Sequence, residues 1–403
     1  MIISSENYKD WELTLFGWTG NRKKTDRSRL LRMREERRRR QAEPIGKTSA
    51  KQNRPAESGR FFDTVANFLS KDVGIDLGTA NVLIYVKGRG IVLDEPAYVA
   101  RDTETSEVLA VGESAKNMRG RTPKGVEVVR PLRHGVIADY DTTEYMLRYF
   151  VSKALPSRPL FKPRIIVCVP SGTTSVERRA VLEATLQAGA RKTVLVEEPL
   201  AAALGVGLDG VKSAGGMLVD VGGGTTDIAV LSRTGVVVSE SLRIGSDVFD
   251  EAVISYLKRK RKLLIGESSA ERLKISVGTT DRKAPVVEAQ VRGRDLVTGL
   301  PKVSVVTSKE IQKALEAPMN EIIESIKSVL EKTPPELLAD ISDRGIVLTG
   351  GGALIDGFDR TLSHGLGMPA FLADSPMYSV IVGTGRALKE MGHFRDTLDE
   401  LQG

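Results

Sequence analysis

The chain has 403 residues, of which 41% are hydrophobic and 28% are charged, an ordinary composition for a globular protein with room for two or more domains. The net charge of +7 is uneven: residues 1–60 hold 16 Lys and Arg against 8 Asp and Glu, so they carry +8 and the remainder carries −1. The body therefore has no basic excess that would predict a nucleic-acid binder, and no apolar run approaches the ~20 residues of a membrane-spanning helix.

Residues 1–57 are predicted to form a basic, disordered extension. They contain an arginine block, residues 37–40, and then a polar, proline-containing stretch with the composition of a linker. The alternative is an electrostatic contact with a membrane or a nucleic acid, since clustered arginine attracts either polyanion.

Residues 58–71 are predicted to form an amphipathic helix. Its large apolar side chains share one face, and they are Phe61, Phe62, Val65, Phe68 and Leu69. This face either packs on the body or lies in a membrane interface, and its aromatic content favours the interface.

The first core element is an apolar strand that ends in a carboxylate. Asp76 is followed by Gly78 and Thr79, which predict a turn, and then by a return strand over residues 82–87. A third strand extends to about residue 98. Residues 99–137 show little apolar periodicity and are interpreted as a small insertion. A helix is predicted over residues 142–154.

A polar loop, residues 156–163, comes next and exposes Leu160 and Phe161 at its tip. The strand 164–169 contains Cys168, the only cysteine, so an intramolecular disulfide is excluded and a buried, inert thiol is predicted. A turn and N-cap then open a helix over 175–188 with Glu177 in its first turn. A strand over 193–196 and an alanine-rich helix over 200–206 follow.

The second half of the chain repeats this order. Strands are predicted over 216–242, and within them Asp220 precedes three glycines, Gly222 to Gly224, and then Thr225. A helix over 247–258, an insertion over about 259–307 and a helix over 308–330 follow. A strand over 345–348 ends in a third glycine cluster, and a final strand and helix lie within 370–389. Two such halves predict a duplicated α/β fold.

The two Asp-Gly-Thr hairpins are interpreted as a pair that faces one nucleotide. Glycine turns expose backbone N–H groups that can wrap a phosphate, and a carboxylate beside each turn can hold Mg²⁺ through water. The motif is neither a Walker loop nor a Rossmann fingerprint, because both of those run directly into a helix. A single glycine-rich hairpin would be weak evidence for a nucleotide site, and the second copy strengthens that evidence.

The third glycine cluster, residues 349–354, suits a flat adenine or an α-phosphate pressed against backbone. Upstream, Glu271 and Lys274 are three residues apart on one predicted helix face, where both could reach a ribose or a base. Taken alone, this pair is better explained as an exposed ion pair between the two side chains.

Together these features resemble the actin, sugar-kinase and heat-shock-chaperone ATPase superfamily, and within it the MreB and Mbl-type bacterial actins. The superfamily motifs are residues 76–81, 169–180, 220–227, 349–354 and 375–387. The stretches that resemble MreB and Mbl are residues 72–82, 130–132, 135–139, 175–180, 263–267, 292–295 and 333–337. The resemblance runs from about residue 60 to 392, and the extension departs from it.

The resemblance implies an actin-like fold of two domains around a nucleotide cleft. Domain I would comprise 72–215 and 371–403, with the insertion near 99–137. Domain II would comprise 216–370, with the insertion near 259–307.

The resemblance also implies ATP and Mg²⁺ as cofactors, with Mg²⁺ held largely through water by Asp76 and Asp220. The implied nucleotide-binding residues are Asp76, Gly78, Thr79, Ala80, Asn81, Gly222, Gly223, Gly224, Thr225, Glu271, Arg272, Leu273, Lys274, Gly350, Gly351, Gly352, Ala353 and Leu354. The implied catalytic residues are Glu177, which would position the attacking water, with Thr225 and Asp220. Without the resemblance, the helix dipole alone explains a first-turn glutamate such as Glu177.

The function implied is that of a slow, polymerisation-coupled ATPase that forms membrane-associated filaments and directs cell shape by organising cell-wall synthesis. Implied partners are further copies of the chain in paired antiparallel protofilaments, the inner face of the cell membrane, and elongation proteins of the RodZ, MreC and MreD types. The implied location is cytoplasmic and peripheral on that membrane, with contacts from Leu160, Phe161 and the helix over 58–71.

Two other ATPase functions compete with this one. A chaperone ATPase would need a peptide-binding domain after the ATPase part, and the chain leaves no room for it before Gly403. A small-molecule kinase would need a substrate pocket with a catalytic base, whereas Glu177 occupies the water-positioning place of the family.

Overall fold

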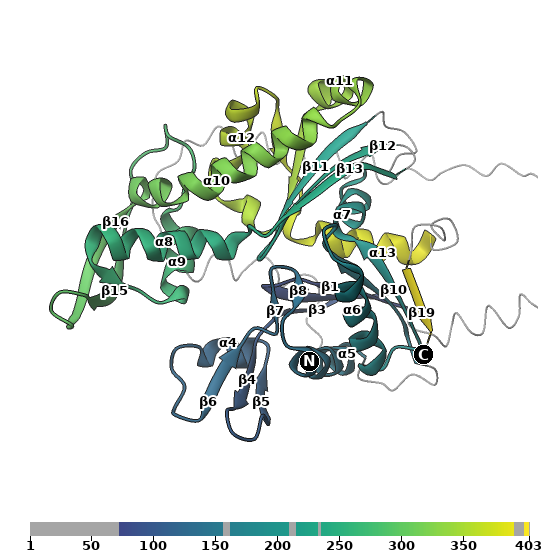
Figure 1. Ribbon diagram of the computed structural model, residues 1–403, viewed down its shortest axis with the longest axis horizontal. Helices are drawn as coiled ribbons and strands as arrows, with labels where there is room; N and C mark the ends of the chain where they lie inside the picture. Colours follow the sequence, from purple (N-terminus) through teal and green to yellow (C-terminus); the bar gives the residue numbers. More distant parts are fainter. Residues whose placement is uncertain (1–71, 156–161, 209–214, 233–234, 391–398, 403) are drawn as a thin grey trace, which may run out of the picture. The chain divides into compact units, whose positions relative to one another are not determined.

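The computed structural model describes residues 72–155, 162–208, 215–232, 235–390 and 399–402 (Figure 1). The predicted extension 1–57 and the predicted helix 58–71 lie outside the described residues, and so do Leu160 and Phe161. None of the helices in the described part of the chain combines the length and the apolar character that a bilayer crossing needs.

The first large sheet has six strands in the order β19-β10-β9-β1-β2-β3. β1 (Val73–Leu77) pairs antiparallel with β2 (Asn81–Val86) and parallel with β9 (Arg164–Val169), so the predicted hairpin and the predicted strand 164–169 are confirmed. The other strands are β3 (Gly90–Pro96), β10 (Lys192–Glu197) and β19 (Asp399–Gln402).

Helices cover both faces of this sheet. On one face α5 (Tyr140–Ala154) and α6 (Ser175–Gln187) contribute Phe150 and Val181 to a core with Ile75 and Val167. On the other face α7 (Glu198–Val206) and α13 (Ser379–Glu390) pack through small and apolar side chains. Because helices bury it on both sides, β9 is apolar at every position from Ile165 to Val169 rather than alternating. We call this sheet with its helices half I.

The second large sheet has five strands in the order β13-β12-β11-β17-β18. Its strands are β11 (Gly216–Val221), β12 (Thr226–Ser232), β13 (Gly235–Leu242), β17 (Ile346–Thr349) and β18 (Ala370–Leu372). β11 pairs antiparallel with β12 and parallel with β17, as β1 does with β2 and β9. We call this sheet with its covering helices half II. The repeated pattern confirms the predicted duplicated α/β fold.

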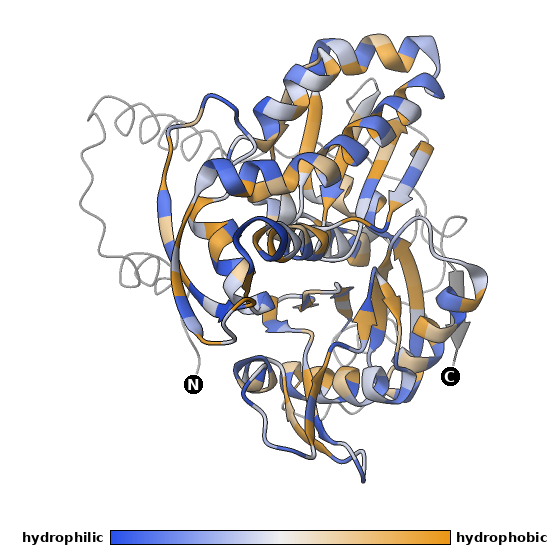
Figure 2. Ribbon diagram, turned by 60° about the vertical axis from the view of Figure 1, so that its left-hand side comes forward, coloured by the Kyte–Doolittle hydropathy of each residue, from blue (hydrophilic) through white to orange (hydrophobic). Residues whose placement is uncertain are grey.

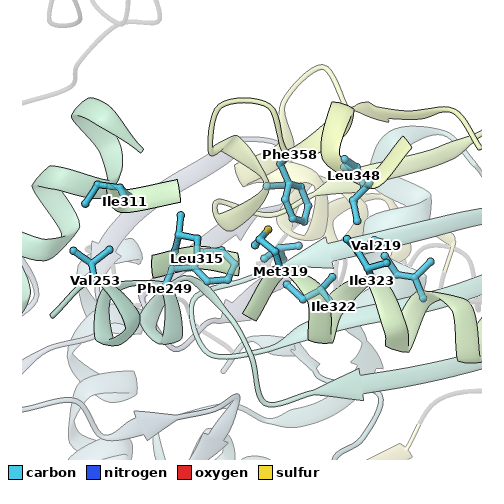
Figure 3. Packing of buried hydrophobic residues seen from close by; sticks show 14 of the residues in the cluster. Val219, Phe249, Val253, Ile311, Leu315, Met319, Ile322, Ile323, Leu348 and Phe358 are labelled. Atoms are coloured by element: carbon cyan, nitrogen blue, oxygen red, sulfur yellow. The ribbon is translucent and has the colours of Figure 1, made fainter. Parts of the chain in front are cut away.

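The core of half II lies between its sheet and two long helices. Phe249 and Val253 of α8 (Ser246–Arg261) meet Leu315 and Met319 of α10 (Ser308–Glu331), beside residues of β11 and β17 (Figure 3). Phe358 of α12 (Phe358–Leu366) closes one end of this cluster. α11 (Pro335–Arg344) lies beside β11. In Figure 2 the strands of both large sheets are mostly hydrophobic, as burial on both faces requires.

The two ranges interpreted as insertions contain small sheets. Between residues 99 and 137 lie β4 (Val99–Asp102), β5 (Val108–Val111), α4 (Glu113–Met118), β6 (Val126–Val129), β7 (Leu132–Arg133) and β8 (Val136–Ile137). Between residues 259 and 307 lie β14 (Leu263–Leu264), α9 (Glu267–Val277), β15 (Glu288–Asp295) and β16 (Pro301–Thr307). The 3₁₀ turn η2 (Gly352–Leu354) lies between β17 and α12, and η3 (Pro376–Tyr378) leads from β18 into α13.

The two chain connections between the halves pass through a close helix crossing. α7 leads from half I towards β11, and α13 returns from half II to lie on β1. A Cβ atom on Gly383 would overlap the carbonyl oxygen of Ala201, and one on Gly205 would overlap that of Ser379. The crossing is therefore a backbone-to-backbone contact that only glycine permits.

Cys168 is buried in half I, and its Sγ lies 2.8 Å from Thr384 Oγ1. Burial raises the pKa of this thiol well above its usual value, with a smaller effect from the nearby Asp76 carboxylate. The prediction of an inert buried thiol is confirmed.

Candidate functional site

A cavity of about 490 Å³ lies between the two halves. The β1–β2 turn enters it from half I with Gly78, Thr79, Ala80 and Asn81, and the β11–β12 turn enters from half II with residues 222–225. The two turns meet closely, because a Cβ atom on Gly223 would lie 2.7 Å from Ala80 Cβ. The structure thus brings the two hairpins predicted from sequence to one site.

Local hydrogen bonds shape the half II turn. The Gly222 N–H donates to the Thr225 carbonyl at 2.9 Å and closes the turn. The carbonyls of Gly222 and Gly223 accept from the N–H groups of Ser246 and Asp247 at 3.0 and 2.9 Å, at the start of α8. α8 therefore holds the turn through its own first N–H groups, which the helix itself leaves unsatisfied. In half I, Thr79 Oγ1 accepts from the Gly135 N–H at 2.8 Å.

Acidic side chains gather at the base of the cavity. Asp76 and Asp220 are the last residues but one of β1 and β11, and both line the cavity. Burial, and then the charges of Asp227 and Asp76, raise the pKa of Asp220 to about 8. Burial and the neighbouring Asp94 raise the pKa of Asp76 to about 7. A cation bound beside them would favour the anionic form of both groups.

The donor set fits a hydrated magnesium ion. Within the described ranges, no three Asp, Glu, His or Cys side chains lie close enough together to ligate a metal directly. Mg²⁺ keeps several water ligands and needs only one or two protein carboxylates besides the phosphates of a nucleotide. Asp76 and Asp220, facing one cavity from opposite halves, meet that requirement.

The far end of the cavity contains the third glycine cluster. Gly350, Gly351, Gly352 and Leu354 line it. Gly350 has φ +84°, a left-handed conformation that favours glycine, and a Cβ atom there would overlap the Val221 carbonyl oxygen. Ala353 is buried behind the cluster and does not contribute to the lining.

Only two of the four α9 residues that were predicted to bind the nucleotide line the cavity. Glu271 and Lys274 line the cavity, whereas Leu273 is buried in the core of half II. Arg272 does not line the cavity, and its guanidinium donates to the Ser268 carbonyl and to Ser269 Oγ. Successive side chains on a helix point in directions that differ by about 100°, so four consecutive residues cannot all face one ligand.

The interpretation of Glu271 and Lys274 as an ion pair with each other was wrong. Lys274 Nζ lies 3.0 Å from Asp250 Oδ1 and donates to the Ser246 carbonyl at 3.0 Å. Glu271 instead lies 3.7 Å from Lys116 Nζ. Partners that the fold brings together from α8 and α4 replace the local one, and both side chains remain at the cavity.

Glu177 does not line the cavity. It occupies the third position of α6 and completes a capping box with Thr174, in which its carboxylate accepts from the Thr174 N–H at 2.8 Å. These hydrogen bonds from Thr174, and then the charge of Arg243, lower the pKa of the carboxyl despite some desolvation. Thr225, by contrast, is buried and lines the cavity.

Two carboxylates in or beside the site, the half-buried Glu198 and the buried Asp227, were not assigned from sequence. Glu198 begins α7 after β10 and lines the cavity, and burial followed by the charge of Asp227 raises its pKa well above the usual value. Asp227 lies on β12, and its Oδ1 accepts from the Ser171 N–H of half I at 3.0 Å. A usable signal for Glu198 existed, because it follows the carboxyl end of a parallel strand, where ligands collect in α/β sheets.

The chain resembles proteins of one family along most of its length. The family model described as MreB/Mbl protein matches residues 70–396. The cell shape-determining protein Mbl of Bacillus cereus is 51% identical over 322 residues, which cover 80% of this chain and 97% of the relative. The cell shape-determining protein MreB of Escherichia coli is 49% identical over 326 residues, which cover 79% and 94%.

Solved structures agree with this similarity. MreB5 of Spiroplasma citri bound to ADP has a TM-score of 0.76 and 34% identity, and it covers 80% of this chain and 97% of its own. The same protein bound to AMPPNP also has a TM-score of 0.76. The MamK double helical filament, at 23% identity and a TM-score of 0.68 over 79% of this chain and 99% of its own, supports the fold alone. The predicted actin-like fold is therefore confirmed.

Proposed function

This chain belongs to the MreB/Mbl family, and from that premise we propose that it is a cell shape-determining cytoskeletal protein that polymerises with bound Mg-ATP. The observation that carries the proposal is the pairing of two Asp-Gly-Thr hairpins across one cavity, with Asp76 and Asp220 at its base. The domain assignment made from sequence is kept as part of the proposal. It is supported by α13 packing on β1 and by β19 pairing with β10, which attach the end of the chain to half I.

ATP would lie with its phosphates between the two turns. Backbone N–H groups at Thr79, Ala80 and Asn81 and at residues 222–225 would bind the phosphate oxygens. Gly350 to Gly352 and Leu354 would form the wall beside the adenosine, with Glu271 and Lys274 near the ribose or base. The solved MreB5 structures with ADP and AMPPNP support a nucleotide in this family, at 34% identity to this chain.

Mg²⁺ would be held through water by Asp76 and Asp220. When bound, it supplies positive charge that neutralises the phosphate oxygens. The raised pKa values of both carboxyl groups describe the cavity without such a charge, so the cation would restore their anionic form. Glu198, which lines the same cavity, adds a third carboxyl group next to this position.

ATP hydrolysis in such a site needs positioning more than covalent chemistry. Thr225 lies where its hydroxyl could hold the terminal phosphate and the attacking water. Glu177 would orient that water through its carboxylate, and for this it must turn from its capping hydrogen bonds towards the cavity. No histidine or cysteine is assigned a role, and the buried Cys168 is unsuited to one.

Sedimentation tests the proposed function directly. Purified protein is centrifuged with Mg-ATP, with ATP plus a chelator, and without nucleotide, and the pellets are viewed by electron microscopy. We expect filaments and a protein-rich pellet with Mg-ATP only. A chain that binds ATP but leaves the same protein in the supernatant under all three conditions, over a wide concentration range, would contradict the proposal.

Association with the inner face of the cell membrane is the second part of the proposal, together with contacts to elongation proteins of the RodZ, MreC and MreD types. It rests on family membership and on apolar sequence at Leu160, Phe161 and the segment 58–71, which lie outside the described residues. Apolar side chains beside basic residues suit an anionic bilayer surface.

Removal of the apolar segments should abolish membrane binding. A variant lacking residues 1–70 and carrying Leu160→Ser and Phe161→Ser is expected to stay in the supernatant when anionic liposomes are pelleted, because insertion of apolar side chains is lost. Nucleotide affinity should be unchanged, since the changes leave every described lining residue of the cavity in place. Liposome pelleting of the variant at the level of the full chain would contradict this assignment.

A further inference from the structure

The residues just before α6 make a direct contact between the two halves. Ser171 of half I donates from its N–H to Asp227 of half II at 3.0 Å and from its hydroxyl at 3.1 Å. Next to it, a Cβ atom on Gly172 would lie 3.0 Å from Ser241 Cβ at the end of β13. The segment that leads into α6, and so to Glu177, is therefore held against β12 and β13 of half II.

Both carboxylate oxygens of Glu177 have partners at this contact. Oε2 accepts from the N–H and from the hydroxyl of Thr174, each at 2.8 Å. Oε1 lies 3.5 Å from Nη2 of Arg243, which follows β13. Thr174 belongs to half I, whereas Arg243 belongs to half II, so the second interaction spans the halves. With these partners, Glu177 stays out of the cavity lining.

We propose that Arg243 is a positioning residue that keeps Glu177 turned away from the nucleotide cavity and thereby slows ATP hydrolysis in the free subunit. The inference rests on the proposed ATPase function and adds a regulator to it. A carboxylate orients an attacking water only if the water can reach a free lone pair within hydrogen-bond distance. Arg243 draws Oε1 towards half II instead.

The pair also links hydrolysis to the relative position of the halves. Its two charges sit on different halves, so a rotation of one half against the other changes their separation without breaking the Thr174 cap. At 3.5 Å the pair is at the long end of ion-pair distances, and the Arg243 side chain is 66% exposed. An exposed pair of this kind is weak, so a small movement is sufficient to free Oε1 from Arg243, and the Thr174 cap is then the remaining restraint on Glu177.

The test is the Arg243→Gln variant. Phosphate release is measured at saturating Mg-ATP with the protein held below the concentration at which it sediments. We expect the variant to release phosphate about two- to fivefold faster, the range set by an exposed ion pair, with KM for ATP unchanged. Arg243→Lys should return the rate towards that of the original chain, because it restores the charge.

Arg179→Gln is the matched control. Arg179 lies on the same helix, is 77% exposed and pairs with Glu183, so its loss removes the same charge without touching Glu177. Its rate should equal that of the original chain. In the double variant Arg243→Gln with Glu177→Ala, the gain should disappear, because the gain requires the freed carboxylate.

Three results would overturn the inference. Arg243→Gln at or below the original rate would do so, and so would a double variant that keeps the gain, since the effect would then bypass Glu177. Both leave the proposed ATPase function intact. A chain that binds Mg-ATP and forms filaments but releases no phosphate in any variant would remove the proposed hydrolysis itself, and this inference with it.

Discussion

Asp220→Asn is expected to abolish Mg-ATP-dependent sedimentation and, in the same protein, to raise the melting temperature of the nucleotide-free state. The first effect follows because the carboxylate proposed to hold Mg²⁺ through water is replaced by a neutral amide. The second follows because Asp220 is buried beside other acids, which raises its pKa to about 8. The amide keeps the shape of the side chain and cannot ionise.

The direction of the pH dependence follows from the same shift. The folded pKa of Asp220 lies above its ordinary value of 3.8, so the folded state binds the proton more tightly than the unfolded chain does. Its contribution to stability is full below pH ~4 and is lost as the pH rises to about 8. At pH 8 the cost to the original chain is on the order of 5 kcal/mol, from about four pKa units at ~1.4 kcal/mol each, and Asp220→Asn should melt at least ~3 °C higher there.

The measurement is a thermal melt of each nucleotide-free protein between pH 5 and pH 8. The original chain should lose more stability across that range than Asp220→Asn does. Asp343→Asn is the control, because Asp343 is an exposed residue of α11 that does not line the cavity. It should leave both melting and sedimentation unchanged. Full Mg-ATP-dependent sedimentation of Asp220→Asn, or a lower melting temperature at pH 8, would count against the metal assignment.

Gly383→Ala is expected to destabilise the protein by ~3 kcal/mol or more, the largest effect of a single methyl group that the structure indicates. The added Cβ atom would overlap the Ala201 carbonyl oxygen where α13 crosses α7. A backbone carbonyl cannot rotate away as a side chain can, so the two helices must separate along the crossing. The apolar contacts of Ala201 and Leu388 with their neighbours would loosen with them.

Urea unfolding and thermal melting measure this loss, and we expect the melting temperature to fall by roughly 6 °C or more. Gly266→Ala is the matched control. Gly266 has φ −83°, and a Cβ atom there would meet nothing within 4 Å. Its cost should be about 1 kcal/mol, because Gly266 is the N-cap of α9 and alanine caps a helix less well than glycine. A Gly383→Ala protein as stable as Gly266→Ala would show that the helices cross less closely than the structure indicates.

Structural features that depend only on neighbouring residues in the chain could be predicted from the sequence. The hairpin at Asp76 and its partner at Asp220 each need only an apolar strand, a glycine turn and a return strand, and all of these are local. The burial of Cys168 followed from its apolar neighbours in the same way. The duplicated fold followed from the repeated order of such elements, since that order leaves few ways to cover two sheets.

Features that depend on distant contacts could not be predicted in this way. Sequence spacing suggested that Glu271 and Lys274 pair with each other, yet the fold gives Lys274 a partner on α8 and Glu271 a partner on α4. Leu273, assigned to the nucleotide together with them, is buried in the core because it lies on the opposite face of α9. Glu198 joins Asp76 and Asp220 only because β10 ends beside β9 in the same sheet.

The two glycine turns, the duplicated α/β fold and the family could be recognised from the sequence, because glycine conformation and apolar periodicity act over a few residues. Tertiary structure alone decided which side chains meet between the halves. Buried charge illustrates why: the pKa of Asp220 reaches about 8 only where Asp227 and Asp76 share its dry surroundings. The position of Glu177 is of the same kind, since Arg243 reaches it from the other half of the molecule.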